Sequence, residues 1–281
     1  MPGPPTVATV GDLDVAAIVG ALGAAGDRPG RLGAAIALHA VVGSTMDLAA
    51  AWAAAGAPDG AVVLADVQAA GRGRHGRAWL APPGTALLLS VVLRHDGPAD
   101  RIGQLPMAVA LGALEAVARR LGPGAAAALK WPNDLVVGDA KLAGLLAEAA
   151  WPGGGGPAAI VGPTVVVGLG LNVATPAAAL PPGATSLAQS GATDLDRSAL
   201  AADLLAAADR HLADLAAGAD LVPRWSARLA TLGRAVTVRD AATGAVVVRG
   251  RAESVADDGA LVVAAADGRR VAVRAGDVTL A

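Results

Sequence analysis

Apolar positions in the first 230 residues follow two spacings, which separate expected strands from expected helices. Continuous runs of branched aliphatic residues, bounded by Gly or Pro, predict buried strands at 62–68, 85–94 and 164–173. Helical spacing predicts one or two short helices between residues 12 and 38, and further helices at 47–56, 102–121 and 197–217. We expect the last of these helices to cover the sheet.

The pattern changes after residue 233. Four short alternating segments, at 236–240, 245–254, 260–267 and 269–280, are separated by the turn sequences ATG, DDG and ADG. They predict a small, separate antiparallel barrel. The chain is therefore predicted to be α+β, with a larger domain at 1–232 that begins with a short helical segment (1–38), and a β-domain at 233–281 bounded near Gly233. The run GGGG at 153–156 predicts a mobile surface loop.

Composition narrows the class of protein. Hydrophobic residues make up 54% of the 281 residues, but Phe, Tyr and Cys are absent, so aliphatic residues, Ala and five Trp must fill the core. The lack of Cys excludes disulfides, thiolate metal sites and a cysteine nucleophile. A net charge of −2 argues against a general nucleic-acid or membrane-surface binder. The four histidines, at 39, 75, 95 and 211, lack ligand spacing, which argues against a metalloenzyme.

The sequence also shows no signal peptide and no membrane-spanning segment. The N-terminal residues lack a basic region and carry Asp12 and Asp14, unlike a signal peptide. Residues 149–193 are uncharged, but Pro and Gly interrupt them too often for a membrane-spanning helix. We expect a soluble protein.

Rare side chains cluster in one region. Of 22 basic residues only Lys130 and Lys141 are lysines, and the only asparagines are Asn133 and Asn172. Three of these four lie within twelve positions. The clustering is either chance or a sign of chemistry that needs an ammonium and an amide side by side.

The most informative segment runs from Gln68 to Trp79 and alternates Gly with Arg. Its glycines fit G-x-G-x-x-G, but Pro82, Pro83 and an apolar strand follow where a dinucleotide-binding turn would open a helix. Such a loop can bring guanidinium and amide groups around phosphate or carboxylate oxygens. A solvated basic loop, or one that contacts nucleic-acid phosphates, is the alternative.

Three further segments are weaker on their own. Lys130-Trp-Pro-Asn-Asp134, followed by Lys141-Leu-Ala-Gly144, has an ordinary turn composition between two lysines. In 168–173 (GLGLNV), glycines allow close backbone approach or simply mark tight packing. Ser44 and Thr45, in GSTMD, can equally be a helix N-cap.

Taken in order, these four segments resemble the biotin protein ligase family. The resemblance covers about residues 40–173, and the tail resembles that family's C-terminal SH3-like domain. It implies a mixed, largely antiparallel sheet covered by helices, of the class II aminoacyl-tRNA synthetase type. Residues 1–38 are too short for the DNA-binding domain of the bifunctional members, so the resemblance is to the monofunctional type. Met46 departs from the pattern, because Asn is common there.

The resemblance implies activation of biotin with ATP to biotinyl-5′-AMP, and transfer of biotin to a lysine of a biotin carboxyl carrier protein, such as that of acetyl-CoA carboxylase. Arg72, Arg74 and Lys141 would be catalytic. Biotin would contact Ser44, Thr45, Met46, Gln68, Gly71, Arg72, Gly73, Arg74, Lys141 and Gly144. ATP would contact Arg74, Arg77, Trp79, Lys130, Asn133, Asp134, Lys141 and Asn172.

Several implications remain open at this point. Asp134 would either orient Mg²⁺ bound with ATP or help to deprotonate the incoming lysine, whereas His75 is interpreted as part of the loop. For Trp79 and Trp131 a role in the core is equally compatible. A cytoplasmic location is expected, no nucleic-acid or membrane partner is expected, and a homodimer is compatible with the sequence. The alternatives are a lipoate or octanoate protein ligase and an Arg-rich nucleic-acid-binding protein.

Overall fold

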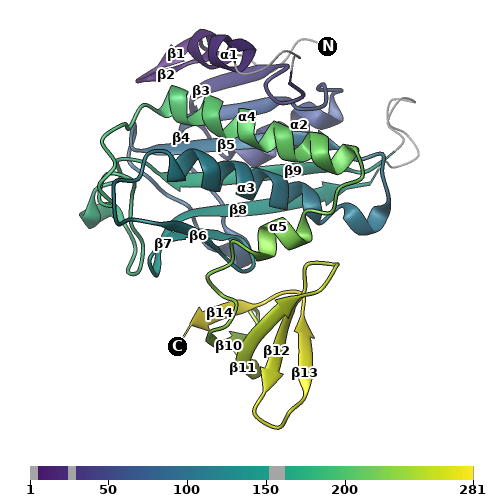
Figure 1. The fold of residues 1–281 in the computed structure, drawn as a ribbon. Helices are drawn as coiled ribbons and strands as arrows, with labels where there is room; N and C mark the ends of the chain where they lie inside the picture. Colours follow the sequence, from purple (N-terminus) through teal and green to yellow (C-terminus); the bar gives the residue numbers. More distant parts are fainter. Residues whose placement is uncertain (1–5, 25–29, 152–161, 281) are drawn as a thin grey trace.

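The larger unit is built on one seven-stranded sheet. The computed structural model describes residues 6–24, 30–151 and 162–280. The strand order is β3-β4-β5-β9-β8-β7-β6; β3 pairs with β4 in parallel and all the other pairs are antiparallel (Figure 1). The strands are β3 (Ile36–Val42), β4 (Val62–Gln68), β5 (Ala86–Arg94), β6 (Ala127–Lys130), β7 (Asp134–Val137), β8 (Ala140–Ala150) and β9 (Thr164–Asn172). The predicted mixed, largely antiparallel sheet is confirmed.

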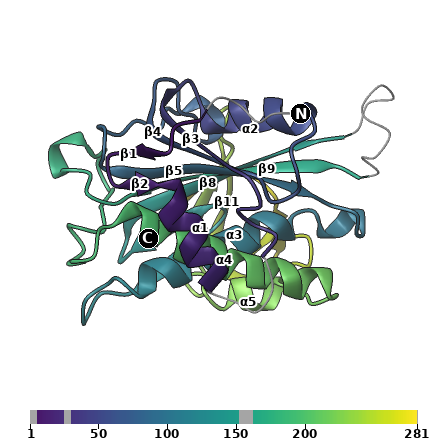
Figure 2. The same ribbon diagram turned by 90° about the horizontal axis from the view of Figure 1, so that it is seen from above.

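Helices cover both faces of this sheet. Figure 2 shows α2 on one side and α1, α3 and α4 on the other. The helices are α1 (Val15–Ala24), α2 (Thr45–Ala54), α3 (Gln104–Ala118), α4 (Arg197–Ala216) and the short α5 (Val222–Ser226). The predicted helices at 47–56, 102–121 and 197–217 and the strands at 62–68, 85–94 and 164–173 are therefore present, with ends shifted by at most three residues.

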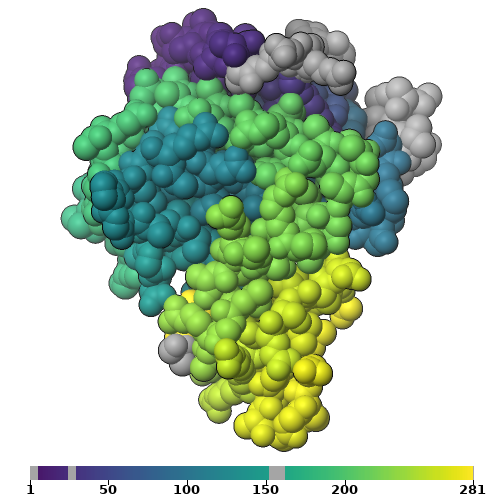
Figure 3. Space-filling view, viewed as in Figure 1, coloured from purple at the N-terminus to yellow at the C-terminus, as the bar shows by residue number. Residues whose placement is uncertain are grey.

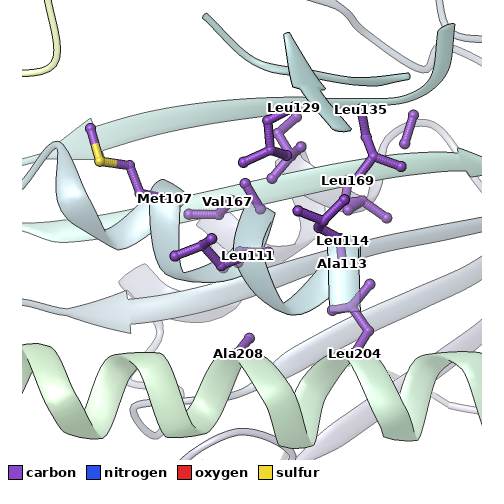
Figure 4. Packing of buried hydrophobic residues seen from close by; sticks show 14 of the residues in the cluster. Met107, Leu111, Ala113, Leu114, Leu129, Leu135, Val167, Leu169, Leu204 and Ala208 are labelled. Carbon is purple, nitrogen blue, oxygen red and sulfur yellow. The ribbon is translucent and has the colours of Figure 1, made fainter. Parts of the chain in front are cut away.

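The core is made of small and aliphatic side chains, as the composition requires. Leu111, Ala113 and Leu114 of α3 lie between the sheet and Leu204 and Ala208 of α4 (Figure 4). The two helices approach closely because residue 112 is glycine: a Cβ at Gly112 would lie 2.5 Å from the backbone N of Ala208. Close packing between these helices therefore depends on small residues and not on interlocking large side chains.

Two parts of the sequence interpretation were wrong or incomplete. The helical segment expected up to residue 38 is helical only in α1; β1 (Thr9–Val10) and β2 (Leu13–Asp14) form a hairpin before it, and β3 begins at Ile36. The run IALHAVV has no clear alternation, and it becomes a strand because it pairs in parallel with β4. Strands β6, β7 and β8 were also not predicted, because their sequences contain Gly, Lys and Ala, which have low β-propensity.

The C-terminal unit is a five-stranded antiparallel sheet in the order β13-β12-β11-β10-β14. Its strands are β10 (Ala235–Arg239), β11 (Val246–Val255), β12 (Leu261–Ala265), β13 (Arg270–Val273) and β14 (Asp277–Leu280). The predicted last segment is two strands, because the chain turns at Gly276 (φ 148°). In the space-filling view this unit lies directly against the larger one (Figure 3).

Within the described residues, no helix combines the length and the hydropathy that crossing a bilayer requires. The loop predicted at 153–156 lies outside the described residues.

A buried arginine ties the N-terminal hairpin to the sheet. Arg197, 1% exposed, donates from Nε to Asp12 (2.6 Å) and from Nη1 to Asp66 of β4 (2.6 Å). Burial raises the pKa of Asp12, but the hydrogen bonds and charge of Arg197 outweigh it, and the net pKa lies below 3.8. This pair therefore stabilises the fold above that pH, and its contribution is lost as the pH falls through the lowered pKa.

Replacing Arg197 with methionine is expected to lower the free energy of unfolding by about 3–5 kcal/mol, because Asp66 would remain buried with no cation beside it, keeping only its hydrogen bond from the N–H of Gly84. Urea denaturation measures this change. Arg210→Met is the matched control on the same helix: its ion pair with Glu115 is exposed, so about 1 kcal/mol or less is expected. Equal losses in both variants would contradict this assignment.

Candidate functional site

A cavity of about 830 Å³ opens between the start of α2, the middle of β8 and β9, and the loop after β4. Every candidate residue named from the sequence lines it, apart from Gly71. These lining candidates are Ser44, Thr45, Met46, Gln68, Arg72, Gly73, Arg74, Arg77, Trp79, Lys130, Asn133, Asp134, Lys141, Gly144 and Asn172. Segments that lie more than a hundred residues apart in the sequence therefore meet at one place.

One wall of the cavity carries hydroxyl and amide groups. Ser44 is the N-cap of α2, and its Oγ accepts from the N–H of Met46 (3.2 Å). The Oε1 of Gln68 accepts from both the N–H and the Oγ1 of Thr45 (2.8 and 2.9 Å). Thr45 in turn accepts from Ser90 (2.8 Å). The N-cap reading of Ser44 is confirmed, and the same bonds fix the orientation of the Gln68 amide.

Two glycines make room for this wall. A Cβ at Gly71 would lie 2.8 Å from the Nε2 of Gln68, so Gly71 shapes the cavity without lining it. A Cβ at Gly168 would lie 2.6 Å from the Cγ of Met46, which is 4% exposed. Met46 thus lies against the backbone of β9 and forms an apolar part of the wall.

The Gly- and Arg-rich segment folds as a narrow hairpin over the cavity. Gly73 donates to the carbonyl of Arg77 (2.7 Å), and Trp79 donates to that of Gly71 (2.8 Å). The tip is a single 3₁₀ turn, Arg74–Gly76, in which His75 has a φ of 59°. His75 is exposed there and does not line the cavity.

The three arginines of the hairpin reach three different parts of the molecule. Arg72 pairs with Asp47 (2.5 Å) and Glu148 (3.3 Å), and the hydrogen bond to Asp47 raises its pKa. Arg74 donates to the Oδ1 of Asn133 (3.2 Å), and burial lowers its pKa. Arg77 pairs with Asp277 of the C-terminal sheet. Arg74 is the most buried of the three and can present a poorly solvated cation to a ligand.

The floor of the cavity is a pair of glycines under an indole ring. Gly144 of β8 and Gly170 of β9 are register partners. A Cβ at Gly170 would lie 2.4 Å from the ring of Trp79, and one at Gly144 would lie 3.2 Å from it. The buried indole N–H of Trp79 has no hydrogen-bond partner in the part of the chain that the structure describes.

Lys141 stands beside this floor. Its Nζ lies 2.6 Å from the Oδ1 of Asp134 and 5.8 Å from the centre of the Trp79 ring. Asn133 is held by two bonds to β8: its side-chain Nδ2 donates to Leu145 O (2.6 Å), and its backbone carbonyl accepts from the N–H of Leu145 (2.9 Å). The cavity therefore places an ammonium, a carboxylate and a guanidinium around one end.

Two sequence families match the chain. Residues 38–160 match the Biotin/lipoate A/B protein ligase family, and residues 231–280 match the Biotin protein ligase C terminal domain. A Mycobacterium tuberculosis protein named biotin--[acetyl-CoA-carboxylase] ligase is 39% identical over 243 residues, which cover 85% of this chain and 86% of that protein. The chain belongs to the biotin protein ligase family.

Other members of the biotin protein ligase family agree. A Paracoccus denitrificans protein of the same name is 37% identical over 224 residues, covering 78% of this chain and 90% of that protein. Among solved structures, the biotin protein ligase from Aquifex aeolicus in complex with biotin and ATP aligns with a TM-score of 0.69 and 23% identity, over 88% of this chain and 99% of that one. This structural likeness concerns the fold.

Some residues that line the cavity were not predicted as ligand contacts, although Gly168 and Gly170 lie in the segment 168–173 that the sequence singled out. The cavity is also lined by Leu80, Leu145, Leu146, Gly168, Gly170 and Leu180, and by Gly276, Asp277, Val278 and Thr279 of the C-terminal unit. No motif or residue spacing near the C-terminal residues predicts a site there. They reach the cavity only through packing between the two units. Trp131 borders the cavity, but it is 2% exposed and its indole N–H donates to Gly259 O (3.0 Å), so it also packs in the core.

Proposed function

We propose that this chain activates biotin with ATP to form biotinyl-5′-AMP and pyrophosphate, and then transfers biotin to a lysine of a biotin carboxyl carrier protein. The observation that carries the proposal is the cavity itself, which brings the hydroxyl and amide wall, the cations and the glycine floor together in a member of the biotin protein ligase family. The named relatives act on acetyl-CoA carboxylase, so its carrier is the proposed partner.

The polar wall is proposed to hold the ureido head of biotin. A bicyclic ring with one urea edge needs few, well-oriented polar groups on an otherwise apolar surface. Ser44, Thr45 and Gln68 supply those groups, while Met46 supplies apolar surface. Gly71 and Gly144 act by allowing neighbouring groups to approach closely, and the N–H of Gly73 closes the hairpin over the cavity.

The first step joins two anions. A carboxylate oxygen of biotin attacks the α-phosphorus, the bond between the α-phosphorus and its bridging oxygen breaks, and pyrophosphate leaves with the electron pair. Fixed positive charge lowers the barrier where negative charge accumulates. Arg72, Arg74 and Lys141 are the proposed sources, with Lys130 and Arg77 nearer the phosphates.

In the second step the lysine amine attacks the acyl carbon, AMP leaves with the electron pair of the broken C–O bond, and the amine loses a proton. Asp134 can accept that proton, because its carboxylate lines the cavity beside Lys141. Trp79 and Asn172 are proposed to contact the adenine, and Asn133 to hold Arg74 in place. Closure of the hairpin would keep water away from the mixed anhydride.

Mg²⁺ is proposed to enter with ATP as part of the substrate. The described residues contain no group of three or more His, Cys, Asp or Glu side chains that could hold a metal ion. A single carboxylate beside an ammonium, as at Asp134, suits a resident metal poorly. Asp134 as a metal ligand therefore stays a prediction, and the phosphates would carry most of the coordination.

Other features remain proposals. They are a class II synthetase-like catalytic fold, an SH3-like barrel, the domain boundary near Gly233, a cytoplasmic location and a homodimer. The absence of a helix able to span a membrane in the described residues is compatible with the proposed location.

ATP–pyrophosphate exchange with purified protein tests the proposal. Biotin, lipoate and no acid are compared at equal concentration in the presence of Mg²⁺. Exchange that depends on biotin is expected. Exchange with lipoate alone would move the protein to the lipoate ligases, and no exchange with either acid from folded protein would overturn the proposal.

A further inference from the structure

The C-terminal sheet contacts both of the segments that carry the chemistry. Asp277, the first residue of β14, pairs with Arg77 of the hairpin over the cavity. The carbonyl of Gly259 accepts from the indole of Trp131, beside Asn133 and Asp134. Residues 276–279 also form part of the cavity wall. The C-terminal unit is therefore part of the site.

The position of Asp277 is determined by the backbone around it. Asp277 is the register partner of Arg239 across β14 and β10. Gly276 precedes it with a φ of 148°, and a Cβ at Gly276 would lie 2.8 Å from the carbonyl of Arg239. The carboxylate is thus presented by a paired strand and not by a free loop.

One ion pair of this kind holds the second strand of the hairpin, which follows the tip. Arg72 reaches α2 and β8 from the ascending strand, and Arg74 reaches Asn133 from the tip. Arg77 alone of the three reaches the C-terminal sheet, and its backbone carbonyl closes the hairpin by accepting from Gly73. A displacement of Arg77 therefore also displaces the whole tip of the hairpin, including Arg74.

We propose that Asp277 is a positioning residue that holds the hairpin of residues 71–79 over the cavity through Arg77, so that the C-terminal sheet sets how long the activated intermediate is retained. This inference rests on the proposed function. The pair is exposed on both sides (63% for Arg77 and 38% for Asp277), so its effect must be modest and sensitive to salt. Asp277 also lies near enough to Arg74 to raise that group's pKa, against the effect of burial.

The test measures release of the intermediate in the full chain. Biotinyl-5′-AMP is formed from biotin and α-labelled ATP with pyrophosphatase present, a large excess of unlabelled ATP is added, and the label retained on the protein is followed. For Asp277→Asn we expect release about 1.5- to 5-fold faster at low salt, with a higher KM for ATP and little change in kcat for carrier biotinylation. Near 1 M salt, where the Debye length is about 3 Å, the difference from wild type should vanish.

Three further variants separate positioning from a general loss of stability. Asp267→Asn, which removes another exposed ion pair within the C-terminal unit, should release the intermediate at the wild-type rate. Asp277→Glu should recover most of the retention. The double variant Arg77→Gln with Asp277→Asn should release no faster than the quicker single variant, because both remove one interaction.

The proposal is overturned if Asp277→Asn retains the intermediate as long as wild type at low salt, or if the effects of the two single variants add. An effect that is the same at all salt concentrations would also overturn it. If wild type itself forms no labelled intermediate from biotin, the proposed function fails instead.

Discussion

Replacing Lys141 with methionine is expected to lower biotin-dependent ATP–pyrophosphate exchange by about 10²- to 10³-fold. Methionine keeps an unbranched stem against Gly144 and the Trp79 ring but removes the ammonium that lies at the end of the cavity. Bonds to Gly183 and Thr185 fix the backbone of Lys141 at this end of the cavity, and the chain has one other lysine, Lys130. Initial rates at saturating ATP and biotin measure the loss.

The loss of exchange rate in Lys141→Met has a second cause besides the missing ammonium, and an additional variant distinguishes the two. In Lys141→Met the carboxylate of Asp134 keeps its place without its ammonium partner, and an unpaired anion near the phosphates would repel ATP. The double variant Lys141→Met with Asp134→Asn removes that repulsion. If the exchange rate of the double variant returns to within a few-fold of wild type, Lys141 acts only by neutralising Asp134, and its proposed contact with the reacting groups is wrong.

Gly170→Ala is expected to raise the KM for ATP by about 5- to 150-fold, which corresponds to the roughly 1–3 kcal/mol typical of overpacking. The added Cβ would lie 2.4 Å from the indole of Trp79, and backbone on both sides of Gly170 is held in β9 between β5 and β8. The ring must therefore move, and the end of the hairpin moves with it. Titration of ATP in the exchange assay measures the change.

Two controls accompany Gly170→Ala: alanine at a glycine that has open space around it, and the same substitution in a protein that lacks the Trp79 ring. Gly20→Ala on α1, where no atom lies within 4 Å of the new Cβ, should leave the KM for ATP unchanged. In a Trp79→Ala background, Gly170→Ala should cost little more, because the clash is gone. A full additional loss in that background would show that Gly170 acts on the nucleotide directly and not through Trp79.

Local signals explain which parts of this protein could be predicted from its sequence. Uninterrupted aliphatic runs predicted β4, β5 and β9, since a strand buried on both faces needs no alternation. The composition of 68–79, with three glycines and three arginines, was sufficient to expect a loop that gathers cations. The family resemblance then brought the separate segments to one site, which composition alone could not do.

Other features depend on pairing between distant segments, and only the tertiary structure decided them. Ile36–Val42 is a strand because β4 offers it a parallel partner, and 127–150 folds as three strands because β9 provides the edge on which β8 forms. The floor under Trp79 exists only because register places Gly144 opposite Gly170. Asp277 reaches the cavity through the packing of the two units, because neither hydrophobic spacing nor composition encodes how one sheet is oriented against another.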